Sequence, residues 1–208
     1  MTVEAVTIDA HGTLVTLRDP VPSLQEALAA RGVERGAAEV EEAFRAEVAY
    51  YVPRSHEGRD DATLALLRRD CARVFLEAAG ADLAPEEFAP AFVEALVFEA
   101  VAGATDACRA LAKAGLRLAV VSNWDVGLHD QLARLGLTAV IDEVVTSAEA
   151  GAPKPDPAVF RLALSRLGVM PGRAVHVGDA PADEEGARAA GMRFEPAPLA
   201  DAARRILA

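Results

Sequence analysis

The stretch VTIDAHGTL, residues 6–14, is a short apolar run that ends at an aspartate and continues into His-Gly-Thr. The preceding residues extend the apolar run to 3–8, and its β-branched side chains predict a buried strand. Asp9 then stands at the carboxyl end of that strand. The residues after it predict a tight turn whose backbone amides can face an anion. Because a cap or turn aspartate has the same appearance, the role of Asp9 depends on the rest of the chain.

Further apolar runs predict four more strands, a weaker one among them. They lie at 116–122, 140–146, 174–178 and, less distinctly, 192–196. Amphipathic helical patterns at 104–115 and 126–136 separate the earlier ones, and each closes with a glycine. Repetition of strand, helix and strand predicts an α/β fold with a parallel sheet that helices cover on both faces.

Between about residues 21 and 98 the pattern becomes entirely helical. Four amphipathic helices are predicted, at 23–32, 37–51, 61–80 and 85–98, with no strand among them. This region is therefore an all-helical insertion after the first strand. The loop 52–61 within it carries Arg54, His56 and Arg59, which can contact a substrate, although an ordinary solvated loop is the favoured interpretation.

Composition limits the classes of function. The chain has 208 residues and a formal net charge of −11, with no run of lysine and arginine, which disfavours nucleic acid and anionic membrane surfaces as partners. A small-molecule substrate is the expected partner. If that substrate carries phosphate, its site must be locally positive through a metal, a lysine or helix N-termini.

Cysteine usage and hydropathy predict the compartment. Cys71 and Cys108 form no C-x-x-C pair, so reduced core cysteines are favoured over a zinc or redox site. The first residues lack a signal-peptide pattern, and no stretch approaches 18 uninterrupted apolar residues. A cytoplasmic location is expected.

Polar side chains follow the predicted strands where a parallel sheet binds its ligands, outside the carboxyl ends. These residues are Asp9, Ser122, Asn123, Lys154 and Asp179. The hydroxyl of Ser122 and nearby amides can hold a phosphoryl oxygen, although a plain loop residue is the alternative. Lys154 precedes Asp156-Pro157, which predicts a helix with Asp156 as N-cap and Pro157 as the first helical residue.

The segment that follows the predicted strand 174–178 is acidic. Asp179 and Asp183 lie in the segment GDAPADEEGARAAG, which is either a solvated helix cap or part of a carboxylate cluster around Asp9. Neighbouring carboxylates raise each other's pKa unless they share a cation. Oxygen ligands of this kind suit Mg²⁺.

Four segments in this order resemble the motifs of the haloacid dehalogenase superfamily of hydrolases. The segments are DAHGTL (9–14), VVSNWD (120–125), GAPKPDP (151–157) and HVGDAPADEEGARAAGM (176–192). Each is short, but four in order at the expected strand ends form a specific pattern. The resemblance implies a Rossmann-like core formed by 1–17 and 99–208, with a small helical cap of the family's first type at 18–98.

The resemblance also implies roles for individual residues. Asp9 is the nucleophile of a phosphatase and forms an aspartyl-phosphate intermediate that water hydrolyses. Mg²⁺ is held by Asp9, Asp179 and the backbone carbonyl of His11, with Asp183 in support. The transferring group is bound by Gly12, Thr13, Ser122, Asn123 and Lys154.

Two positions depart from the family pattern. Family phosphatases carry a second aspartate where this chain has His11, so His11 either serves as the acid and base or marks weakened catalysis. The supporting acid is Asp183 or Glu184, depending on the end from which the motif is counted, and Asp183 is preferred. A 2-haloacid dehalogenase-like hydrolase and a catalytically weakened fold that binds a ligand or partner therefore remain as alternatives, and the substrate and oligomeric state are open.

Overall fold

Five parallel strands form the main sheet of the computed structural model, which describes residues 2–208. Their order across the sheet is β5-β4-β1-β6-β7, and every neighbouring pair is parallel. The bounds are β1 Ala5–Ile8, β4 Arg117–Ser122, β5 Glu143–Thr146, β6 Ala174–Gly178 and β7 Arg193–Pro196. The predicted α/β fold is confirmed, and each of the five predicted strands is present.

The register of the sheet brings the carboxyl ends of the three central strands, β4, β1 and β6, close together. Thr7 of β1 pairs with Ala119 of β4 on one side and with His176 of β6 on the other. Side chains alternate between the faces of a strand, so residues two apart lie on the same face. Asp9, just beyond β1, is therefore expected on the same face of the sheet as Thr7. It lies at the carboxyl end of β1, where the neighbouring strands β4 and β6 also end.

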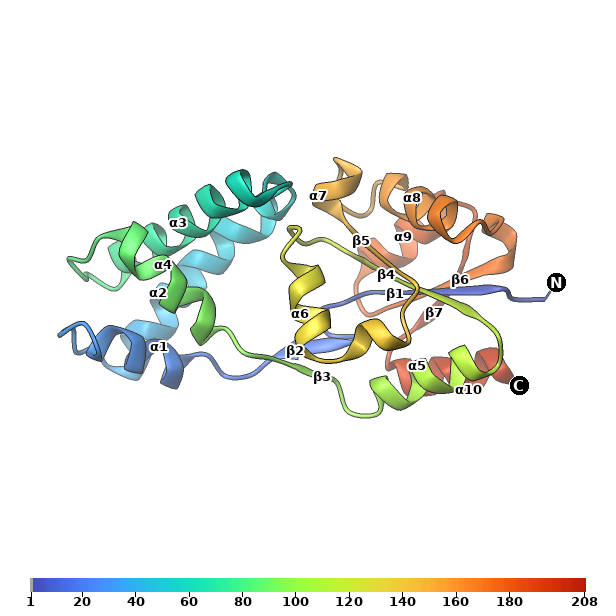
Figure 1. Cartoon of the computed structure of the whole chain (residues 1–208), viewed down its shortest axis with the longest axis horizontal. Helices are drawn as coiled ribbons and strands as arrows, with labels where there is room; N and C mark the ends of the chain where they lie inside the picture. Colours follow the sequence, from blue (N-terminus) through green and yellow to red (C-terminus); the bar gives the residue numbers. More distant parts are fainter. Residues whose placement is uncertain (1) are drawn as a thin grey trace. The chain divides into compact units, whose positions relative to one another are not determined.

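Helices cover both faces of this sheet (Figure 1). One face carries α8 (Ala158–Leu167) and α9 (Pro181–Ala189), and the other carries α5 (Ala104–Lys113) and α10 (Leu199–Leu207). Strand residues such as Ala119 and Val121 belong to one buried cluster with Phe160 of α8. The remaining short elements are α6 (Leu128–Arg134), η2 (Leu137–Ala139), α7 (Ser147–Ala150) and η3 (Pro171–Arg173).

The chain divides into two compact units. One contains the residues up to Thr16 together with Glu99–Ala208, and the other contains Leu17–Phe98. The second unit is built from α1 (Val21–Ala29), α2 (Ala37–Tyr51), η1 (Val52–Glu57), α3 (Asp61–Ala78) and α4 (Pro85–Ala95). Phe75, Phe88 and Phe92 pack against one another in its core, with ring centroids 5.1–6.3 Å apart and only Phe75 and Phe88 stacked. Both cysteines are buried, one in each unit, which agrees with the predicted core positions.

The structure corrects the expectation that no strand interrupts the helical region. The predicted helix 85–98 ends at Ala95, and Phe98–Ala100 forms β3, which pairs with β2 (Val15–Leu17). Strands of three residues are too short to produce a recognisable alternation of apolar and polar residues.

Two smaller predictions were also wrong. The expected loop 52–61 begins with the 3₁₀-helix η1, in which Arg54 stacks on Tyr50 with 4.3 Å between the guanidinium carbon and the ring centroid. The helix after Lys154 begins one residue later than predicted, with Pro157 as its N-cap. Asp156 still accepts a hydrogen bond from the amide of Ala158 at 2.8 Å, so its capping chemistry is retained.

Among the described residues, no helix combines the length and the apolar character needed to cross a membrane.

Candidate active site

Asp9 is a buried carboxylate that follows β1 directly. Only 6% of its surface is exposed. Its Oδ1 atom accepts hydrogen bonds from Nζ of Lys154 at 2.5 Å and from Oγ of Ser122 at 3.1 Å. Side chains from three separate segments of the chain therefore meet at the strand ends, as the parallel sheet predicts.

Lys154 connects two carboxylates. Its Nζ donates to Oδ1 of Asp9 at 2.5 Å, to Oδ1 of Asp183 at 2.6 Å and to the carbonyl oxygen of Val121 at 3.2 Å. An ammonium group has three N–H donors, so these partners use all of them. Lys154 in this arrangement neutralises and orients carboxylates, and a substrate oxygen would have to displace one of its present partners.

Asn123 holds the backbone of Lys154. The Asn123 side-chain amide donates to the carbonyl oxygen of Lys154 at 3.1 Å, and its Oδ1 accepts from the Lys154 amide at 2.6 Å. A pair of opposed hydrogen bonds fixes both the position and the orientation of that peptide. Asn123, predicted to bind substrate, is thus engaged with the segment that carries the lysine.

Asp183 is fully buried in the first turn of α9. Its Oδ2 accepts from the amide of Ala180 at 3.0 Å, and its Oδ1 lies 3.1 Å from Nε2 of His176 as well as beside Lys154. Burial alone would raise the pKa of this carboxyl. The hydrogen bond from His176 and the charge of Lys154 together hold the pKa well below its usual range.

Glu184, the alternative supporting acid, is not one of the three carboxylates that gather at the strand ends, Asp9, Asp179 and Asp183. It pairs with Arg188 one turn along α9, at 2.5 Å, and both side chains are exposed. Successive residues of a helix point about 100° apart, so only one of the two acids can enter the site. The structure places Asp183 there.

Asp179 follows β6 and is held by the loop after Asp9. Oγ1 of Thr13 donates to Oδ1 of Asp179 at 3.0 Å. Gly12 has φ +82°, and a Cβ atom there would lie 2.5 Å from Oδ2 of Asp179, so the turn requires glycine. Asp179 is exposed and lines a hollow of about 360 Å³ whose wall includes Phe194.

His11 is exposed, two residues after the buried Asp9. Its backbone forms an isolated bridge with Val15, which closes the turn. The group of carboxylates that can share a cation does not include its ring. The predicted use of its backbone carbonyl and its imidazole therefore stays a prediction.

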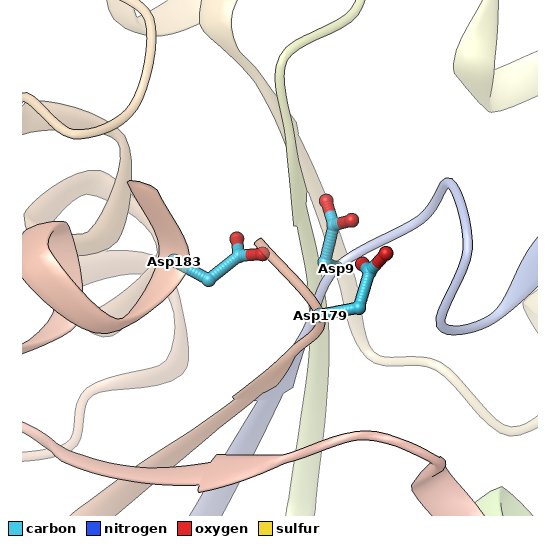
Figure 2. A group of neighbouring side chains, drawn as sticks. All are labelled: Asp9, Asp179 and Asp183. Carbon is cyan, nitrogen blue, oxygen red and sulfur yellow. The ribbon is translucent and has the colours of Figure 1, made fainter. Parts of the chain in front are cut away.

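The carboxylates of Asp9, Asp179 and Asp183 fit a divalent cation. One oxygen from each lies within 4.8 Å of the others, and Figure 2 shows Asp9 and Asp179 at adjacent strand ends with Asp183 directed toward them from α9. The donors are all oxygen, as Mg²⁺ prefers. Both oxygens of Asp183 already accept hydrogen bonds, so Asp9 and Asp179 are the better direct ligands, and Asp183 is better placed to support them.

The buried groups Asp9 and Lys154 shift each other's pKa in the site. Burial raises the pKa of the Asp9 carboxyl against the opposing charge of Lys154, and the Asp183 carboxylate adds to the rise. Burial lowers the pKa of Lys154, but Asp9 and Asp183 raise it further, so the group stays an ammonium. Lys154 is thus shared between two carboxylates, and the raised pKa of Asp9 shows that one ammonium does not fully offset its burial, so Asp9 would gain from a second cation.

Thr7 and His176 are buried polar residues that were not predicted to belong to the site. Oγ1 of Thr7 lies 2.8 Å from Nδ1 of His176, and both side chains are fully buried. Each is a polar residue inside its own parallel strand, β1 or β6, and this was the available signal, because such strands are normally apolar throughout. Its meaning depends on the register, which the sequence alone does not define.

Comparison with known proteins gives a consistent assignment. The family model for haloacid dehalogenase-like hydrolases matches residues 3–191. A phosphoglycolate phosphatase from Rhodospirillum rubrum is 36% identical over 203 residues, which cover 91% of this chain and 77% of that protein. The haloacid dehalogenase-like hydrolase domain-containing protein 3 of Mus musculus is 44% identical over 113 residues, or 54% of this chain and 43% of the relative. The matches thus span less than half the length of such mammalian relatives.

Solved structures share the fold. A HAD phosphatase from Thermococcus onnurineus aligns with a TM-score of 0.65 and 25% identity, covering 99% of this chain and 98% of that one. A defluorinating L-2-haloacid dehalogenase aligns with a TM-score of 0.76 and 22% identity, covering 99% and 96% of the two chains. At this identity the second likeness supports the fold alone.

Proposed function

Because this chain belongs to the haloacid dehalogenase-like hydrolases, we propose that it is a Mg²⁺-dependent phosphatase of a small phosphorylated metabolite. Asp9 accepts the phosphoryl group, and water then releases it as inorganic phosphate. Phosphatases are named among the relatives in sequence and in structure, which supports the reaction class and leaves the metabolite open.

The observation that carries this proposal is the excess of carboxylates over cations. Asp9, Asp179 and Asp183 converge, and Lys154 is the ammonium between two of them. Displacement of a halide by a carboxylate needs no metal, and without a metal the three converging carboxylates would have Lys154 as their shared cation. A phosphatase gains a site for a cation that neutralises the phosphoryl oxygens.

The side chains divide the first chemical step among them. The Asp9 carboxylate forms a bond to phosphorus while the bond from phosphorus to the leaving oxygen breaks. Ser122 is close enough to Asp9 for its hydroxyl to donate to a phosphoryl oxygen. Lys154 fixes Oδ1 of Asp9, and His11, two residues further on, supplies the proton that the leaving oxygen takes up.

The second step uses the same groups in reverse. A water molecule attacks the phosphorus of the aspartyl phosphate, His11 accepts its proton, and the Asp9 carboxylate is regenerated. Bound Mg²⁺, held by Asp9 and Asp179, would contribute neutralisation of the negative charge on the phosphoryl group. The products are an alcohol and inorganic phosphate.

A turnover screen tests the proposal. Purified protein is incubated with phosphorylated metabolites and with short 2-haloacids, with and without Mg²⁺, and phosphate and halide are measured separately. The proposal predicts phosphate release that requires Mg²⁺. Halide release would support a dehalogenase instead, and ligand binding without either product would support a binding protein.

A thermal-shift experiment tests the metal site without turnover. A ligand at 100 times its Kd stabilises the folded protein by about 2.7 kcal/mol, so saturating Mg²⁺ should raise the melting temperature. Asp179→Ala should lose this shift. Glu184→Ala is the matched control, because Glu184 pairs with Arg188 and lies outside the carboxylate group, and it should keep the shift.

A further inference from the structure

Thr7 and His176 form a polar cross-strand pair inside an apolar sheet. The two residues are register partners on β1 and β6, with 2.8 Å between Oγ1 and Nδ1. Both are completely buried, and the ring of His176 meets Phe160 edge-on with 4.9 Å between centroids. Buried polar groups in such a position are costly unless every atom is hydrogen-bonded, so a specific arrangement is being maintained.

The other ring nitrogen of His176 reaches the candidate site. Nε2 lies 3.1 Å from Oδ1 of Asp183, the same oxygen that accepts from Nζ of Lys154 at 2.6 Å. That lysine also donates to Asp9. A continuous series of hydrogen bonds therefore runs from Thr7 through His176, Asp183 and Lys154 to the nucleophile.

The chemistry of the two partners defines the tautomer of the histidine. An ionised carboxylate only accepts hydrogen bonds, so Nε2 must carry a proton toward Asp183. In the neutral ring Nδ1 then has a lone pair, which the Thr7 hydroxyl satisfies as donor. Thr7 in this way favours the tautomer that Asp183 requires.

We propose that His176, oriented by Thr7, is a positioning residue that holds Asp183 toward Lys154 and thereby keeps the lysine ammonium on Asp9. The inference rests on the proposed function for its effect on turnover. Loss of the Nε2 donor leaves Asp183 held by the amide of Ala180 and by Lys154 itself, so its Oδ1 atom is directed less firmly at the ammonium. Because the series ends on the nucleophile, the change should appear in kcat more than in KM.

Glutamine and asparagine at position 176 provide matched variants. The side-chain nitrogen of glutamine reaches about as far as Nε2, whereas that of asparagine reaches only about as far as Nδ1. His176→Gln should therefore keep the donor to Asp183, and His176→Asn should lose it. Supporting groups of this kind typically change activity ~10- to 100-fold, so we expect a fall of that size in kcat for His176→Asn and substantial rescue in His176→Gln.

Lysine NMR supplies a readout that does not depend on turnover. The chain contains only two lysines, Lys113 and Lys154, and Lys113 is exposed on α5. In ¹⁵N-lysine protein the buried Lys154 ammonium should show protons protected from exchange, while Lys113 serves as the internal exposed reference. The protected signal should persist in His176→Gln and disappear in His176→Asn.

The outcomes separate the two claims. A folded His176→Asn protein with unchanged kcat and an unchanged Lys154 signal overturns the positioning role. If His176→Asn does not fold, Thr7→Val is tested in its place, because it replaces the hydroxyl with a methyl group and keeps the shape of the side chain. Reduced kcat and weaker protection of the Lys154 ammonium in Thr7→Val would support the positioning role. Wild-type values of both would overturn it. If the wild type turns over no substrate, the phosphatase proposal fails while the NMR comparison still decides the positioning.

Discussion

Nζ of Lys154 lies 2.5 Å from Oδ1 of Asp9, and the two side chains are 6% and 8% exposed. This buried ion pair joins a loop after β5 to the end of β1, 145 residues apart in the sequence. A buried charge is tolerated when it is paired and hydrogen-bonded, and removal of one partner leaves the others without compensation.

Lys154→Met should therefore destabilise the protein as well as stop turnover. The variant keeps an unbranched side chain one atom shorter but leaves Asp9 and Asp183 buried without their ammonium, and loss of one member of a buried pair costs about 3–5 kcal/mol. Urea denaturation measures the change. Lys113→Met, on the exposed surface of α5, is the control and should stay within about 0.5 kcal/mol of wild type. Equal stability of the two variants would contradict the buried role of Lys154.

Gly178→Ala should displace Asp183 by steric contact. A Cβ atom at Gly178 would lie 2.4 Å from Cγ of Asp183, closer than real contacts allow, so the first turn of α9 must shift. Overpacking of this kind costs about 1–3 kcal/mol, and kcat should fall with it. Gly172→Ala is the matched control, because a Cβ there meets nothing within 4 Å. A normal kcat in a folded Gly178→Ala protein would show that the position of Asp183 is unimportant.

His11→Ala tests the proton donor. If the imidazole protonates the leaving oxygen, kcat/KM for alkyl phosphates should fall by about 10²–10⁴-fold, because an alkoxide is a poor leaving group. Aryl phosphates, whose leaving group needs no proton, should be affected much less. The measurement is kcat/KM of both proteins on one substrate of each kind. An equal loss on both would indicate a binding role, and no loss on either would indicate that the site works without this acid.

Glu47→Gln should stabilise the helical unit in a pH-dependent way. Glu47 is 4% exposed on α2, and burial raises its pKa to about 7 from 4.5, against a hydrogen bond with Cys71. As the pH rises from 4.5 to 7, the unfolded chain releases the proton and the folded chain retains it, so stability falls. With about 1.36 kcal/mol per pKa unit, the glutamine should gain about 3 kcal/mol above pH 7 and little below pH 4.5.

Denaturation of wild type and Glu47→Gln at pH 4 and pH 8 measures this difference. Glu42→Gln, on the exposed side of the same helix, is the control and should change stability little at either pH. A gain in Glu47→Gln of the same size at both pH values would contradict the raised pKa.

The sequence predicted those site residues that can be recognised from their immediate neighbours in the chain. Asp9, Ser122 and Asp179 were found because a polar residue after an apolar run is visible locally, and parallel strands bring their ends together. The five strands of the sheet were found for the same reason. The pair β2 and β3 was missed because three residues carry too little pattern.

The connections among those parts could not be predicted. The contact of Thr7 with His176 depends on which residues of β1 and β6 are opposite each other. Asp183 was preferred over Glu184 by counting residues, but the rotation of α9 that brings it into the carboxylate group is visible only in the structure. The role of Lys154 in binding the transferring group stays a prediction, and its hydrogen bonds to Asp9, Asp183 and Val121 became visible only in the structure. Each of these facts is set by tertiary packing over long sequence separations.

The covalent role of Asp9 is tested most directly by acid quench of the working enzyme followed by mass spectrometry of its peptides. During turnover of a phosphorylated substrate, the account predicts that the peptide containing Asp9 gains the mass of one phosphoryl group. It also predicts that Asp9→Asn, which keeps the shape but loses the attacking charge, shows neither this adduct nor turnover. Continued phosphate release by Asp9→Asn, with no adduct on the wild-type peptide, would contradict the account.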